Sequence, residues 1–258
     1  MKKIKEVLDY KQMIYSLVRK DLRGRYKGSV LGFLWTFVNP TFQLLIYTFV
    51  FSVILRSDIE KFYLYLFVAL IPWIFFQSSV SGGATAITSQ KDLVKKIYFP
   101  REVLPISYVT SCFINMLFCF IIIFVVVIIS GVGINITAIL CLPIVMIVEY
   151  ILALGMALLS SAITVYFRDL EHILGLVTMA WLYLTPILYS ITIVPKELLP
   201  LYNINPMTPI IEAYRDILYY KQIPRIETLG QGFILGILIL SLGWFVFGRL
   251  NKHFAEEL

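Results

Sequence analysis

Charged residues are scarce in this sequence, and so are histidine and cysteine. Of its 258 residues, 15% are Asp, Glu, Lys or Arg and 59% are hydrophobic, whereas soluble domains carry about 25% charged and about 45–50% apolar residues. The two histidines are far apart, and the three cysteines lie within apolar runs without the spacing of a disulfide framework or a metal site. The composition excludes an ordinary soluble domain and indicates a membrane protein with several spans.

Motifs of the common catalytic sites are absent as well. The sequence contains no Gly-x-x-x-x-Gly-Lys-Ser/Thr phosphate loop, no His-Glu-x-x-His and no Gly-x-Ser-x-Gly. We therefore expect no catalytic residue, metal or cofactor in this chain, and no ATP hydrolysis by this chain alone. The net charge of +6 does not indicate nucleic-acid binding, because the cations lie beside apolar segments. No cleaved signal peptide is expected, since no apolar segment with a cleavage site directly follows the basic N-terminus.

Long charge-free runs predict the membrane spans, because one Asp, Lys or Arg at the centre of a span costs about 2.5–3.5 kcal/mol. The run between Glu102 and Glu149 is too long for one crossing at about 20 residues each, and the Gly- and Asn-containing segment 131–135 supplies a turn. We predict an all-α integral membrane protein with one domain, 1–258. Its segments are a cytoplasmic and interfacial part (1–29), six spans (30–55, 62–87, 104–130, 137–167, 172–191 and 228–248) and a cytoplasmic tail (249–258).

Lys and Arg are distributed unevenly among the connecting segments. Sixteen of the 22 fall in the N-terminal segment, the 91–101 loop, the Arg168 loop and the tail. The positive-inside rule therefore predicts a multi-pass protein of the cytoplasmic (inner) membrane with both termini in the cytoplasm.

Two cytoplasmic segments are amphipathic. Residues 10–18 repeat apolar side chains at helical spacing, which predicts a helix in the headgroup plane, either a collar around an entrance or a simple anchor. In the second segment, Ser89 and Asp92 have the spacing of a capping box, and Pro100 ends the helix at Phe99. This short helix either docks into a groove of a partner or is a solvated loop whose lysines only set the topology.

The segment that follows Tyr189 is too long and too apolar for an ordinary connector. Prolines divide it, and Thr208-Pro209 has the pattern of a helix start. We predict a re-entrant helical hairpin, which would imply a pathway nearby, because irregular backbone at membrane depth requires protein or water around it. Within the spans, Glu149 is the one plainly buried charge that the sequence predicts, with either a structural or a coupling role.

The stretch Arg25-Tyr-Lys-Gly-Ser-Val-Leu-Gly-Phe-Leu-Trp35, followed by Asn39-Pro40, resembles the entry to the first span of type-2 ABC exporter permeases. The likeness is to those that export lipid-linked polysaccharides such as O antigen, capsule or teichoic acid. It covers essentially the whole chain in length, span number and three further motifs: Phe99-Pro100-Arg101 with Leu104-Pro105, Tyr166-Phe-Arg-Asp-Leu170 and Asn205-Pro206-Met-Thr-Pro209.

The resemblance implies that two copies of this chain form a channel for the glycan, with O antigen as the first candidate. Two copies of a cytoplasmic nucleotide-binding subunit would bind ATP and Mg²⁺. The residues implied as contacts with that subunit are Asp92, Leu93, Lys95, Lys96, Ile97, Tyr98, Arg168 and Asp169. Those implied in an outer gate are Pro186, Pro206, Pro209 and Tyr214.

A sugar chain must slide past weak contacts, as in other pores, and aromatic faces can stack on sugar rings without trapping them. The candidate aromatic residues, which are also typical of interfacial belts, are Trp35, Tyr47, Phe51, Trp181, Tyr183 and Tyr189. A lipid pyrophosphate would meet cations at the cytoplasmic boundary, since Arg binds phosphate through two nitrogens. Arg23, Arg25 and Lys27 are the candidates, although such cations also set topology.

Two other functions remain open at this stage. A permease of the same architecture could move a small molecule or a drug. An integral membrane transferase would need acid and base groups held together in a site, and the few acidic residues here lack convergent partners in the sequence.

Overall fold

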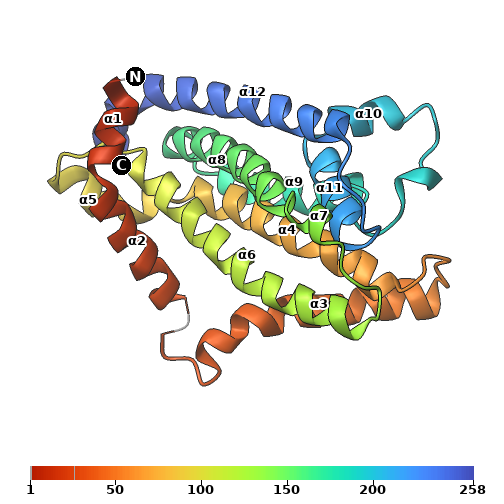
Figure 1. Cartoon of the computed structure of the whole chain (residues 1–258). Coiled ribbons are helices and arrows are strands. Elements are labelled where there is room, and N and C mark those ends of the chain that lie inside the picture. Colours follow the sequence, from red (N-terminus) through yellow and green to blue (C-terminus); the bar gives the residue numbers. More distant parts are fainter. Residues whose placement is uncertain (1, 26) are drawn as a thin grey trace.

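The computed structural model describes residues 2–25 and 27–258, and for residues 2–4 and 255 it describes the backbone alone. Every regular element in these ranges is helical. The long apolar helices lie side by side in Figure 1: α3 (Trp35–Thr48), α4 (Phe62–Ala84), α6 (Val103–Ile129), α8 (Leu142–Tyr166) and α12 (Ile226–Leu250). The shorter α-helices are α1 (Lys2–Asp9), α2 (Lys11–Gly24), α5 (Lys91–Lys96), α7 (Ile136–Ile139), α9 (Leu170–Leu184), α10 (Leu199–Ile204), α11 (Met207–Leu218) and α13 (Phe254–Glu257).

Within the described ranges, five helices are long and apolar enough to cross a membrane, which indicates an integral membrane protein. They are Gly32–Ile54, Phe62–Ala84, Val103–Ile129, Ile136–Tyr166 and Ile226–His253. The predicted span 172–191 corresponds to α9, whose 15 residues reach only about 22 Å at 1.5 Å per residue. A hydrocarbon core is about 30 Å thick. The helix ends early because Thr185 precedes Pro186 and adopts an extended conformation (φ −109°, ψ 138°).

Helix α4 is the centre of the bundle. It packs against α3, α6, α8, α9 and α11, and 78% of its apolar window is buried, compared with 11% for the first span. The difference identifies α4 as the core helix and α3 as a helix whose apolar surface faces the surroundings of this chain.

The irregular segments follow local sequence preferences. The turn predicted at 131–135 is present, with Gly131 and Gly133 at positive φ (65° and 82°). The next span begins with α7, which Asn135 caps by accepting a hydrogen bond from the Thr137 N–H at 3.1 Å. Between α2 and α3 the chain turns at Gly28 and Gly32, also at positive φ, and α3 continues into a π-helical segment, Phe49–Ile54.

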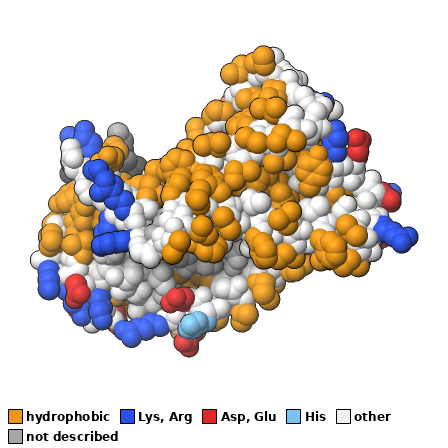
Figure 2. Space-filling view, turned by 90° about the horizontal axis from the view of Figure 1, so that it is seen from below, with side chains coloured by type: hydrophobic (Ala, Val, Ile, Leu, Met, Phe, Trp, Pro, Cys, Tyr) orange, Lys and Arg blue, Asp and Glu red, His pale blue; other side chains and the backbone are white. Residues whose placement is uncertain are grey.

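The two termini lie at the same end of the bundle (Figure 1). We call this the terminal end, defined by α1, α5 and α13, and the other the distal end, defined by α10, α11 and the 131–135 turn. A hydrophobic cluster at the terminal end joins Val7 of α1, Val94 of α5 and Phe254 of α13. Figure 2 shows a broad hydrophobic band, with Lys and Arg side chains gathered at its two ends.

Candidate functional site

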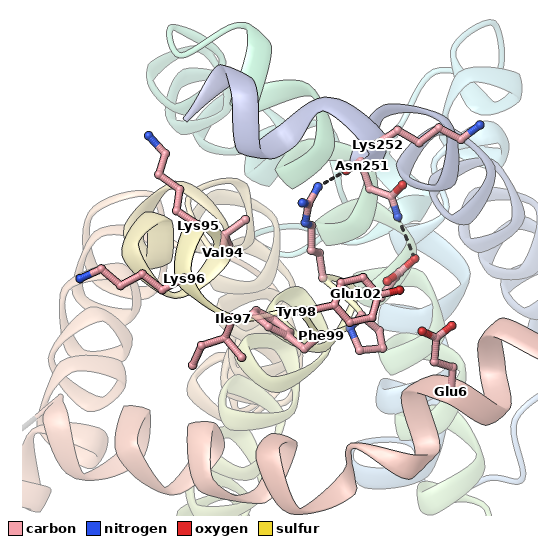
Figure 3. Close-up of a pocket in the computed structure, with 12 residues that line it drawn as sticks. Glu6, Val94, Lys95, Lys96, Ile97, Tyr98, Phe99, Glu102, Asn251 and Lys252 are labelled. Carbon is pink, nitrogen blue, oxygen red and sulfur yellow. Dashed lines mark hydrogen bonds between the residues drawn. The ribbon is translucent and has the colours of Figure 1, made fainter.

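The terminal end carries a pocket of about 610 Å³. Residues 94–102 line it from one side, Asn251 and Lys252 from another, and Glu6 of α1 from a third. In Figure 3, Lys95 and Lys96 extend away from Asn251 and Glu102. The pocket is therefore bounded by three segments far apart in the sequence.

The predicted capping box at the start of α5 is wrong. Ser89 lies in a preceding 3₁₀ turn, Thr88–Gln90, and its hydroxyl donates to the Ala86 carbonyl at 3.5 Å. The helix begins at Lys91 and ends at Lys96, because Ile97 is extended (φ −131°, ψ 136°). Asp92 lies in its first turn and two lysines in its last, as the helix dipole favours.

The apolar side chains of this segment divide into two sets. Val94 and Phe99 are buried in the cluster of the terminal end, whereas Ile97 is 55% and Tyr98 88% exposed. Of the other predicted contact residues, Leu93 is half-buried, and Asp92, Lys95, Lys96, Arg168 and Asp169 are exposed. Because α8 ends at Tyr166, whose ring contacts Phe254, the Arg168 turn lies at the terminal end as well.

Residues 249–258, predicted as a cytoplasmic tail, form part of the folded terminal end. The Asn251 amide nitrogen donates to Glu102 Oε1 at 3.2 Å. The Arg101 guanidinium donates to the Asn251 carbonyl and lies 5.8 Å from the centre of the Phe254 ring. Apolar burial of Phe254 fixes this segment, which the sequence alone does not reveal.

A second pocket, of about 410 Å³, lies between α2, the segment that joins α4 to α5, and α6. Its polar lining includes Lys20, Asp21, Arg25 and Tyr108. The two other predicted cations, Arg23 and Lys27, are exposed and are not part of its lining. Of the three predicted cations, the structure thus places Arg25 at this pocket.

Arg25 is held by several groups. It makes a salt bridge to Asp21 at 2.9 Å and donates to the Ser111 hydroxyl and the Cys112 sulfur, each at 3.2 Å. Burial acts to lower the pKa of Arg25, but the Cys112 and Asp21 side chains outweigh it, so the pKa lies above its ordinary value. Arg25 therefore stays charged while it fastens α2 to α6.

At the distal end, the four predicted gate residues are all buried. The Tyr214 hydroxyl donates to Glu149 Oε2 at 2.6 Å, which joins α11 to α8. Helix α11 begins at Met207 rather than at Pro209, because the Asn205 side chain accepts from the Met207 N–H at 3.0 Å. In this chain the gate residues therefore lie in packed protein.

Glu149, the buried charge predicted within the spans, is 0% exposed. Outside the spans, α11 carries a further buried charge that the sequence analysis did not identify, since Arg215 is also 0% exposed. Its guanidinium pairs with Glu212 at 2.8 Å, donates to the Ile187 carbonyl at 2.8 Å and lies 3.7 Å from the Tyr65 ring centre. The sequence signal was an arginine on the apolar side of a predicted helix, where only a paired charge is stable.

The six predicted aromatic residues lie in different surroundings. The Trp181 ring packs on Phe76 with centroids 5.2 Å apart, and its N–H donates to Asn205 Oδ1 at 3.0 Å. Phe51 stacks on Phe62 within the chain. The others range from half-buried, in the case of Tyr47 and Tyr189, to exposed, in the case of Trp35 and Tyr183.

No group of three or more His, Cys, Asp or Glu residues that could hold a metal ion occurs in the described part of the chain. Both pockets are lined by cations and apolar side chains side by side.

Comparison with known proteins defines the class of this helical bundle. The profile of ABC-2 type transporters matches residues 12–219. The chain therefore belongs to the ABC-2 type transporter family.

Three relatives show which members it is similar to. It is 34% identical to the O-antigen export system permease protein RfbA of Myxococcus xanthus over 257 residues, 99% of this chain and 98% of the relative. It is 30% identical to RfbA of Klebsiella pneumoniae over 246 residues, 95% of each chain. The polysialic acid transport protein KpsM of Escherichia coli is 22% identical over 210 residues, 80% of this chain and 81% of the relative.

Proposed function

We propose that this chain is the transmembrane subunit of an ATP-driven exporter that moves a lipid-linked polysaccharide across the cytoplasmic membrane. O antigen is the first candidate for this polysaccharide. The observation that carries the proposal is the 34% identity, over nearly the full length of both chains, to a permease named for O-antigen export. The more distant likeness to a polysialic acid transport protein supports a polysaccharide cargo. Two copies of this chain form the channel.

The pocket at the terminal end is the docking surface for a nucleotide-binding subunit, which binds ATP and Mg²⁺. Ile97 and Tyr98 project from the loop after α5, and an exposed aliphatic and an exposed aromatic side chain beside lysines are suited to insertion into a groove. The exposed turn at Arg168 and Asp169 contributes to the same contact.

Six crossings with both termini in the cytoplasm are part of this proposal. The neighbouring positions of Val7 and Phe254 in one cluster support an even number of crossings. The sixth crossing is the short helix α9. It begins just after α8 ends, at the terminal end. The chain beyond it reaches the distal end, where the Ile187 carbonyl accepts a hydrogen bond from Arg215 of α11.

Substrate enters beside α2. The pocket that Arg25 and Lys20 line receives the lipid pyrophosphate of the glycan, because guanidinium and ammonium groups bind phosphate oxygens. The exposed Arg23 and Lys27 attract it at longer range. Reversing the charge in Arg25→Glu is expected to abolish export.

Beyond the entrance, the glycan passes the six aromatic residues named above, and α10 and α11 form the re-entrant outer gate with Pro186, Pro206, Pro209 and Tyr214. The exposed side chains of Tyr183 and Trp35 support a pathway along α9 and α3. The amphipathic α2 lies in the headgroup plane around the entrance.

The experiment is to purify this chain with the ABC subunit encoded beside it, in lipid nanodiscs, and to measure ATP turnover with a lipid-linked glycan. We expect turnover to change with the glycan and not with unrelated hydrophobic drugs. Stimulation by drugs alone would replace the glycan proposal with a small-molecule permease. Transport by this chain without any second protein would overturn the proposal entirely.

A further inference from the structure

The C-terminal end of α12 is held by side chains of other helices. The last carbonyls of a helix lack partners within it. Here the Leu250 carbonyl accepts from the Tyr166 hydroxyl at 2.8 Å, and the Asn251 carbonyl accepts from Arg101. A cation near this end is also favoured by the helix dipole. The end of α12 is therefore bound to the start of α6 and the end of α8.

The Asn251 side chain adds a second link to the same loop. Its amide donates to the carboxylate of Glu102, which is 4% exposed. A buried carboxylate needs donors, so this contact and the one from Arg101 hold residues 101 and 102 against α12. The same residues line the docking pocket.

Along its length, α12 is in backbone contact with α8. A Cβ atom added to Gly155 would lie 2.6 Å from the Leu240 nitrogen, and one added to Gly243 would lie 2.3 Å from the Gly155 oxygen. At these positions no side chain separates the two backbones, and packing this close favours movement of the two helices as one unit. We therefore treat α8 and α12 as one rigid pair.

The other end of α12 meets the outer helix α11. A Cβ atom added to Gly232 would lie 3.4 Å from Ile210 and 3.7 Å from Pro209. The pair α8–α12 thus contacts the docking pocket at one end of the molecule and α11 at the other.

We propose that Arg101, Glu102 and Asn251 form a clamp that fixes the docking loop to α12, so that the rigid α8–α12 pair passes displacement of the loop to α11. The three are positioning residues, since they act through α12. This inference rests on the proposed function, because it needs a subunit that moves the loop.

The test compares Asn251→Ala with His253→Ala in the purified complex with the ABC subunit. His253 is exposed in the same turn, but it lies outside the lining of the docking pocket and has no part in the clamp. We expect Asn251→Ala to lower the glycan moved per ATP about tenfold, since a hydrogen bond to a buried carboxylate is lost. ATP turnover and retention of the ABC subunit should persist, and His253→Ala should match the unaltered protein.

A second pair of variants separates the clamp from simple loss of folding. Glu102→Gln keeps an acceptor oxygen for Asn251 and is expected to retain coupling, whereas Glu102→Leu is expected to lose it. Export is normalised to the amount of permease in the nanodiscs. Equal coupling in Glu102→Leu, Asn251→Ala and the unaltered protein would overturn the clamp.

A measurement of movement near α11 tests the clamp independently of which cargo is exported. A cysteine replaces Ile223, which is 60% exposed just beyond α11, in a Cys141→Ser background. Its maleimide labelling rate is expected to change with ATP in the complex and to stop changing in Asn251→Ala. If the complex moves no lipid-linked glycan, the proposed function fails. An ATP-dependent labelling rate that Asn251→Ala leaves intact contradicts the clamp alone.

Discussion

The two ends of the molecule differ in how far their charged and aromatic side chains are buried. At the terminal end, Tyr98 is 88% exposed beside a pocket of about 610 Å³. At the distal end, Arg215, Glu149 and Tyr214 are all 0% exposed and bonded to groups within the chain. The terminal end therefore presents exposed side chains that a partner can contact. At the distal end, polar groups bond within the chain and hold an irregular segment in place.

The largest effect is expected from Arg215→Leu at the distal end. The change leaves Glu212 and the Ile187 carbonyl without their guanidinium partner, and breaking a buried pair in this way costs about 3–5 kcal/mol. We expect a lower melting temperature of the detergent-purified protein and less permease in membranes. Arg215→Lys should recover only part of the lost melting temperature, because an ammonium group cannot reproduce the two-pronged hydrogen bonding of a guanidinium.

The matched control is Lys196→Leu, an exposed cation in the segment between α9 and α10. Its melting temperature should equal that of the unaltered protein. A stable Arg215→Leu protein would show that the distal end does not depend on its buried cation.

At the terminal end, Ile97→Asp and Tyr98→Ala should act on association and not on stability. Both side chains are exposed in this chain, and central aromatic or aliphatic contacts of an interface contribute about 2 kcal/mol or more, roughly a thirtyfold loss of affinity. The measurement is the dissociation constant for the ABC subunit, with the melting temperature of the permease alone as a check.

Ile193→Asp is the control, because Ile193 is 70% exposed in the distal segment before α10. If it weakened association as much as Ile97→Asp, the docking surface would not be confined to the terminal end.

The Glu149–Tyr214 pair separates a structural role from a coupling role. Tyr214→Phe removes the donor to a buried carboxyl group and should cost about 1–3 kcal/mol. Glu149→Gln keeps an acceptor oxygen and is expected to export at nearly the unaltered rate. Export abolished in Glu149→Gln, with normal amounts of permease, would assign Glu149 a proton-coupling role instead. The readout is surface glycan in cells that lack their own permease.

The sequence predicted the helices well where a single property decides them. Apolar runs set α4, α6, α8 and α12 nearly to their observed bounds, because burial of long apolar segments dominates. Pro186 also signalled a break, although the predicted span ran past it to residue 191. What depends on the exact turn before a helix, or on side chains from distant segments, was not predictable.

Two examples show the limit. Ser89 has the spacing of a helix cap, but its hydroxyl bonds to Ala86 instead because a 3₁₀ turn precedes α5. Asn251 falls in the predicted cytoplasmic tail, and the sequence gives no sign of its partner Glu102, which lies 149 positions away. The roles of candidate site residues such as Tyr98 stay predictions, because local amphipathicity tells only which side chains share a helix face.

The smallest effect is expected from Arg25→Lys at the entrance pocket. Lysine keeps the positive charge near Asp21, but its single nitrogen cannot also maintain the contacts with Ser111 and Cys112 in the same geometry. Losing one such hydrogen bond costs about 0.5–1.5 kcal/mol, so we expect export to fall several-fold with normal ATP turnover. Arg23→Lys, at an exposed neighbour, should leave export unchanged. An equal loss in both variants would mean that the entrance responds to charge density alone and that the pocket between α2 and α6 adds nothing to the recognition of phosphate.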